Sequence, residues 1–168
     1  MFKIETIGKG FIAIMAYPGK EQDAASAIAA LARDGVRQVV SLLEPAEAAA
    51  LGLDAEVQLV VAQSMRFVSF PIPDMGLPAS VSAFAGLAHD LYRQVDAGDN
   101  TLLHCRGGVG RSGLLAAAVL LHCGMDPRQA CERVTRMRGL HVPETTEQGA
   151  WLLANHAVLA VPQAAGRC

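Results

Sequence analysis

A cysteine and an arginine separated by five residues form the pair in this chain best suited to chemistry. They belong to a nine-residue segment, the Cys105 loop, that reads His104-Cys105-Arg106-Gly107-Gly108-Val109-Gly110-Arg111-Ser112. Cys105 offers a sulfur nucleophile, and the planar guanidinium of Arg111 matches two oxygens of a phosphate group. The pair therefore indicates attack of sulfur on a phosphate ester.

The elements on either side of this loop would activate the sulfur and bind the phosphate. A short apolar strand, 101–104, precedes the loop, and an apolar helix, 111–123, follows it. At a helix N-terminus the pKa of a thiol can fall to ~3.5–7.5, because the helix dipole stabilises the thiolate. Glycines allow successive backbone amides to face inward around an anion. We expect the substrate phosphate to be bound by Arg106, Gly107, Gly108, Val109, Gly110 and Arg111.

Two flanking residues have expected roles of their own. Ser112 can donate its hydroxyl to Cys105 and help the sulfur leave in the second half of the reaction. His104 would orient the loop through hydrogen bonds from behind, without touching substrate. The alternative is a phosphate-binding turn with an incidental cysteine, since the Cys-x5-Arg spacing alone arises by chance. The strand–loop–helix context and the flanking His and Ser favour the catalytic interpretation.

A general acid is also needed, because the leaving oxygen would otherwise depart as a costly anion. Asp74 is the best candidate, 31 residues before Cys105, on a segment that follows the preceding strand. This segment, the Asp74 loop (residues 71–78), is stiffened by three prolines. The alternative is a turn aspartate or a helix cap.

Strands and helices alternate along the chain. Strands are expected at 3–7 and 11–15, forming a hairpin, and at 36–43, 66–72 and 101–104. Helices are expected at 20–34, at 44–64 in two pieces, and at 80–97 with Ser80 as cap, 111–123, 127–137 and 145–159. This order predicts an α/β fold with a central, mostly parallel sheet flanked by helices on both faces. We expect one domain, 1–168, with a frayed tail at 162–168.

Composition narrows the partners. The chain has 168 residues and a formal net charge of −2, and 5% of its residues are aromatic, so neither nucleic acid nor an anionic membrane is an expected partner. Its four cysteines have no metal-ligand spacing, which favours a reduced, cytoplasmic protein without a metal or cofactor. A monomer is expected.

Taken together, the Cys105 loop and Asp74 resemble the cysteine-dependent protein phosphatases, in their compact dual-specificity branch. The His-Cys-x5-Arg-Ser pattern is similar to the signature loop of that family, and Phe70-Pro71-Ile72-Pro73-Asp74 is similar to its general-acid loop. The resemblance covers 35–153, and residues 1–34 match only loosely. It implies a phosphatase-like fold with the signature loop between a strand and a helix. It also implies a Cys105 nucleophile, an Arg111 clamp, an Asp74 acid and no metal.

One departure from the family pattern concerns the water-positioning segment. Where tyrosine phosphatases often read Gln-Thr-x-x-Gln, this chain has Glu144 in place of the first Gln and keeps Gln148. A carboxylate near a bound phosphate would repel it or would need a partner such as Arg138. Either the segment stands off from the site, or Gln148 alone places the water. A helix-capping role for the segment is at least as well supported.

For two further cysteines and three arginines, the sequence supports only general expectations. Cys123 and Cys131 are expected as small core residues, with a redox role toward Cys105 left open. Arg133, Arg136 and Arg138 are expected to form a solvated face near the rim of the site.

The predicted function is hydrolysis of phosphotyrosine in a phosphorylated protein or peptide, through a phosphocysteine intermediate, with phosphoserine and phosphothreonine as further candidate substrates. A phosphoinositide or other non-protein phosphomonoesterase is the alternative, disfavoured because Arg106 is the one added cation in the loop. A non-catalytic binder of phosphorylated partners would typically lack the Cys or the Arg.

Overall fold

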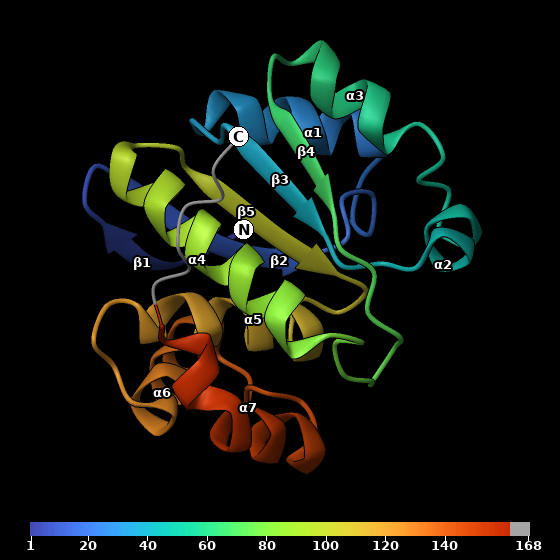
Figure 1. Ribbon diagram of the computed structural model, residues 1–168. Coiled ribbons are helices and arrows are strands. Elements are labelled where there is room, and N and C mark those ends of the chain that lie inside the picture. The colour runs from blue at the N-terminus through green and yellow to red at the C-terminus, as the bar shows by residue number, and fades with distance from the viewer. Residues whose placement is uncertain (162–168) are drawn as a thin grey trace.

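A five-stranded sheet in the order β1-β2-β5-β3-β4 forms the centre of the computed structural model, which describes residues 1–161 (Figure 1). β1 and β2 pair antiparallel, and the other neighbouring strands pair parallel. The predicted mostly parallel sheet is thereby confirmed. The strands are β1 (Phe2–Ile7), β2 (Gly10–Ala16), β3 (Gln38–Ser41), β4 (Arg66–Ser69) and β5 (Thr101–Cys105).

Helices cover both faces of the sheet, as the alternating pattern predicted (Figure 1). On one face α1 and α3 pack on alternate strand residues such as Val39 and Leu102. The other face is covered by α4, α5, α6 and α7, which pack on the intervening strand residues, such as Val40 and Leu103. The helices in the described part of the chain are α1 (Ala24–Arg33), α2 (Pro45–Ala50), α3 (Glu56–Ala62), α4 (Val81–Ala97), α5 (Gly110–Leu121), α6 (Pro127–Arg138) and α7 (Thr146–Leu159).

Side-chain caps mark the starts of α1, α4, α6 and α7. Ser80 caps α4 by accepting the amide of Ala83, as predicted. The first helix was predicted to begin at residue 20, and this is wrong because Asp23 accepts the amide of Ser26 and starts α1 at Ala24. The two pieces predicted within 44–64 are α2 and α3, separated near Gly52, which has a φ of +72°.

The parallel strands direct the loops that follow them to one edge of the sheet. The Cys105 loop follows β5, α2 follows β3, and the Asp74 loop follows β4. Ligands of open α/β sheets bind at this carboxyl edge. α5, which begins there, is buried along its whole length, since its residues after Ser112 are apolar or Gly.

Among residues 1–161, no helix combines the length and the apolar character that crossing a membrane requires. The tail predicted at 162–168 lies outside the described residues.

Candidate active site

Cys105 is the last residue of β5 and is 2% exposed, so its sulfur lies at the base of the loop. Its Sγ lies 3.4 Å from Oγ of Ser112, in the first turn of α5. α5 begins at Gly110, one residue earlier than predicted, which brings the helix N-terminus into the loop. The hydroxyl, the sulfur and the positive end of the helix dipole thus come together.

The backbone of the loop is shaped by Gly108. Its φ is +66°, and a Cβ there would overlap the carbonyl of Met15 at the end of β2. The loop therefore folds closely over β2, which only glycine permits. None of the hydrogen bonds among the described residues uses the amides of 106–109, which leaves these N–H groups free to meet an anion.

Arg111 is almost fully buried and is bound by a carboxylate that the sequence reasoning missed. Its Nη1 and Nη2 donate to the two oxygens of Glu47 at 2.7 and 2.9 Å, and Nη1 also donates to the carbonyl of Ile72 at 3.0 Å. The bonds from Arg111 hold the pKa of Glu47 below its ordinary value. Burial would lower the pKa of Arg111, but the bond to Glu47 and the nearby Cys105 outweigh it and raise that pKa. Arg111 is therefore a fixed cation.

Asp74 reaches the same guanidinium. Its Oδ1 accepts from Nη2 of Arg111 at 2.8 Å and from the amide of Met75 at 3.1 Å. Its Oδ2 lies 3.9 Å from Nη1 of Arg106, and about half of the Asp74 side chain is exposed to solvent. The candidate acid and the candidate clamp are thus in direct contact, with the carboxylate accessible to a substrate.

His104 lies behind the loop, on the face of the sheet that α3 covers. Its Nε2 is 2.9 Å from Oε1 of Glu56, and both side chains are buried. Among the contacts of the described residues, its imidazole makes no hydrogen bond to the loop. The predicted hydrogen bonds from His104 to the loop are thus wrong for the described residues, and His104 instead steadies the end of β5 against α3.

The segment with Glu144 and Gln148 does not stand off from the loop. A Cβ built on Gly110 would lie 2.8 Å from Oε2 of Glu144 and 3.1 Å from Oε1 of Gln148. Gln148 is buried, and its Nε2 donates to the carbonyl of Gly76 at 3.0 Å. This bond links α7 to the Asp74 loop. Thr145 also caps α7 through the amide of Gln148, so the capping role and proximity to the site coexist.

The three arginines of α6 differ in environment. Arg136 is exposed, as expected of a solvated face. Arg133 pairs with Glu5 at 2.9 Å. Arg138 is half-buried and binds backbone carbonyls of the Cys105 loop, and no ion pair among the described residues joins it to Glu144.

Glu47 and Glu56 are the residues that sequence reasoning missed. Glu47 lies in the first turn of α2, directly after β3, and a carboxylate just beyond a parallel strand was the available signal. Glu56 had none, because its partner is 48 residues away in a strand of the sheet.

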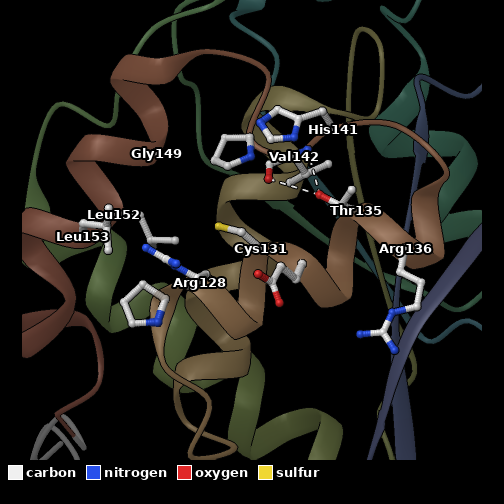
Figure 2. Close-up of a pocket in the computed structure, with 12 residues that line it drawn as sticks. Arg128, Cys131, Thr135, Arg136, His141, Val142, Gly149, Leu152 and Leu153 are labelled. Carbon is white, nitrogen blue, oxygen red and sulfur yellow. Dashed lines mark hydrogen bonds between the residues drawn. The ribbon is translucent and has the colours of Figure 1, made fainter.

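This site contains no cluster of metal-binding side chains among the described residues, and the cavity shown in Figure 2 lies elsewhere. Within residues 1–161 no group of three or more His, Cys, Asp or Glu side chains could hold a metal ion. A cavity of about 510 Å³ lies between α6 and α7, lined by Cys131, Thr135, Val142 and Leu152 among others (Figure 2). No residue of the Cys105 loop lines it.

Known proteins match both the sequence and the fold. The sequence model of the family described as "PTP-SAK: Swiss Army Knife protein, DSP-PTPase phosphatase domain" matches residues 2–151. Cyclin-dependent kinase inhibitor 3 of Sus scrofa is 34% identical over 84 residues, which are 49% of this chain and 39% of that protein. The match thus spans well under half the length of that relative.

Two solved structures extend the match to nearly the whole chain. The structure of Tk-PTP in its active form is 27% identical with a TM-score of 0.72, covering 94% of this chain and 95% of that one. The structure of kinase associated phosphatase (KAP) is 23% identical with a TM-score of 0.84, covering 95% and 93%, and so supports the fold alone.

Proposed function

This chain belongs to the PTP-SAK family of DSP-PTPase phosphatase domains, and on that premise we propose that it hydrolyses phosphotyrosine in proteins through a phosphocysteine intermediate. The family and fold are those of enzymes that hydrolyse phosphate esters. The observation that carries the proposal is the 2.8 Å contact between Asp74 and Arg111, because it joins the acid to the phosphate clamp.

In the first step the Cys105 thiolate attacks phosphorus while the bond from phosphorus to the leaving oxygen breaks. The free amides of 106–109 and the guanidinium of Arg111 bind the phosphoryl oxygens, whose charge they stabilise in the transition state. Asp74, in its protonated form, gives its proton to the leaving oxygen. The products of this step are phosphocysteine, an alcohol or phenol, and the Asp74 carboxylate.

In the second step water attacks phosphorus and the bond from phosphorus to sulfur breaks. The Asp74 carboxylate takes a proton from the water and is thereby restored as the acid. The hydroxyl of Ser112, 3.4 Å from Sγ, donates to the departing sulfur and stabilises the thiolate. Inorganic phosphate then leaves, so that atoms and charge balance over the cycle.

The burial of Cys105 is compatible with phosphotyrosine as substrate. Cys105 is 2% exposed, and a phosphate on a long phenyl ring reaches such a nucleophile more readily than one on a serine side chain. The chain is also similar to Tk-PTP, whose name contains the abbreviation PTP, and this similarity agrees with phosphotyrosine as substrate. Arg106 is the one cation among 106–110, which gives the loop little means to bind additional phosphates.

The test is hydrolysis of a small aryl phosphate by wild type, Cys105→Ser and Asp74→Asn. We expect Cys105→Ser to be inactive yet still to bind an oxyanion, and Asp74→Asn to slow poor leaving groups most, because these depend on protonation. Full activity in Cys105→Ser would refute the mechanism. Phosphotyrosine peptides, phosphothreonine peptides and inositol phosphates would then be compared by kcat/KM, and a preference for inositol phosphates would refute the proposed substrate.

A further inference from the structure

Arg138, in the last turn of α6, holds two consecutive carbonyls of the Cys105 loop. Its Nε donates to the carbonyl of Gly108 at 2.7 Å, and its Nη2 donates to that of Gly107 at 3.1 Å. The guanidinium also lies over the ring of Phe2 in β1, with 4.4 Å between Cζ and the ring centroid. The cation is therefore fixed between the sheet edge and the loop.

These bonds determine where two backbone amides point. In a planar trans peptide the C=O of one residue and the N–H of the next point in opposite directions. When Arg138 draws the carbonyls of Gly107 and Gly108 toward itself, the amides of Gly108 and Val109 must point away from it. Both belong to the set of amides that makes no hydrogen bond among the described residues.

The loop needs such a restraint because two glycines follow one another in it. A peptide between glycines can rotate at little steric cost, and a rotation would turn a carbonyl oxygen toward the bound anion and repel it. Packing against Met15 limits Gly108 on one side, but a Cβ on Gly107 would meet only Val109, at 4.0 Å. Arg138 is the side chain that holds the carbonyl of Gly107.

We propose that Arg138 is a positioning residue that sets the anion-binding geometry of the Cys105 loop through the carbonyls of Gly107 and Gly108, an inference that rests on the proposed phosphatase function. Arg138 does not touch the substrate. It acts on the direction of two N–H groups, so its loss weakens oxyanion binding in the ground state as well as turnover.

The test measures binding of tungstate, a phosphate-like oxyanion, by calorimetry in the Cys105→Ser background. Arg138→Met is compared with Arg138→Lys and with Arg136→Met, which removes an exposed arginine of the same helix. We expect Arg138→Met to weaken tungstate binding by roughly tenfold or more, the scale of a lost charged hydrogen bond. Arg138→Lys should fall in between, because a lysine lacks the two-pronged donor geometry. Arg136→Met should bind tungstate as tightly as the parent Cys105→Ser protein.

Amide NMR separates positioning from a general loss of charge or structure. In the parent protein the amide signals of Gly108 and Val109 should shift on addition of tungstate, and in Arg138→Met these two shifts should largely disappear. If Arg138→Met binds tungstate as Arg136→Met does, with the same amide shifts, the proposal is overturned. If Arg138→Met does not fold, Arg138→Lys decides, and parent-like affinity in that variant overturns the proposal.

The two hypotheses can fail separately. Wild-type protein that hydrolyses no phosphate ester, while Arg138→Met loses tungstate binding, would refute the proposed function and support the positioning role. Active wild-type protein, together with unchanged tungstate binding in Arg138→Met, would support the proposed function and refute the positioning role.

Discussion

Arg111 has two carboxylate partners of different character. Glu47 takes both terminal nitrogens in a largely buried pair, whereas Asp74 takes one and is half exposed. A phosphate that binds Arg111 would therefore compete with Asp74 and leave the contact with Glu47 in place. This division fits a fixed clamp and a movable acid.

Changing Glu47 to Gln should lower kcat/KM for an aryl phosphate by about tenfold to a hundredfold, since bonds of 1.5–3 kcal/mol to a charged group orient the clamp. Glu44→Gln is the matched control, because Glu44 is exposed and precedes the same helix. Steady-state kinetics checks the prediction, and equal activity in both variants would show that Glu47 does not orient Arg111.

The Glu47–Arg111 pair should also make folding stability depend on pH. The native pKa of Glu47 is lowered from 4.5, so the pair stabilises the fold above that value, and the stabilisation is lost as pH falls through the native pKa. The free energy of unfolding of wild type should therefore exceed that of Glu47→Gln at neutral pH, and the two should converge as the pH falls below the native pKa of Glu47. Denaturant titrations at several pH values measure this, and a constant difference would be the contrary result.

At the scale of elements, the Cys105 loop depends on how closely it folds over β2. Gly108→Ala should destabilise the protein by more than about 1 kcal/mol and abolish most activity, because it combines a positive φ with overlap on Met15. Gly107→Ala should be tolerated, since its Cβ meets nothing closer than Val109. Thermal unfolding and kcat/KM, measured for both glycine variants, test this prediction. Similar losses in both variants would contradict this account of the loop.

The order and type of the elements could be predicted from the sequence, whereas several of their ends could not. Apolar runs and capping residues identify the strands and helices, because local pattern and propensity agree throughout. β3 and β4 are shorter than the apolar runs 36–43 and 66–72, although single backbone hydrogen bonds, such as the one from the amide of Phe70 to the carbonyl of Ser41, continue beyond their ends. The start of α1 depends on which side chain accepts an amide, which a helical pattern alone does not indicate.

At the scale of the whole molecule, the parallel sheet brings together residues that lie far apart in the sequence. Cys105, Arg111, Ser112 and Asp74 could be identified from local sequence, because each lies in a recognisable loop. The contacts of Glu47 with Arg111 and of Arg138 with the loop carbonyls are not predicted by the local sequence, because they come from α2 and α6. These contacts exist only once the strands have set the positions of the helices.

The same arrangement separates Cys105 from Cys123. α5 runs between them for 12 residues, which is about 18 Å at a rise of 1.5 Å per residue. Cys123 is exposed, so the expectation that it is a core residue is wrong. Partial desolvation by its neighbours nevertheless raises the pKa of its thiol to about 11, which makes it a poor nucleophile at neutral pH. Peroxide treatment should therefore give no intramolecular Cys105–Cys123 disulfide. Peptide mapping under non-reducing conditions checks this, and recovery of the linked peptides would require a different conformation.

The most direct test of the central claim is to trap the phosphoenzyme. Wild-type protein is mixed with a phosphotyrosine peptide, quenched in acid during turnover and digested, and the site of phosphate is determined by mass spectrometry. We predict phosphate on the peptide that contains Cys105 in wild type and none there in Cys105→Ser. Turnover of the substrate with phosphate never found on Cys105, or found on another residue, would contradict the proposed mechanism.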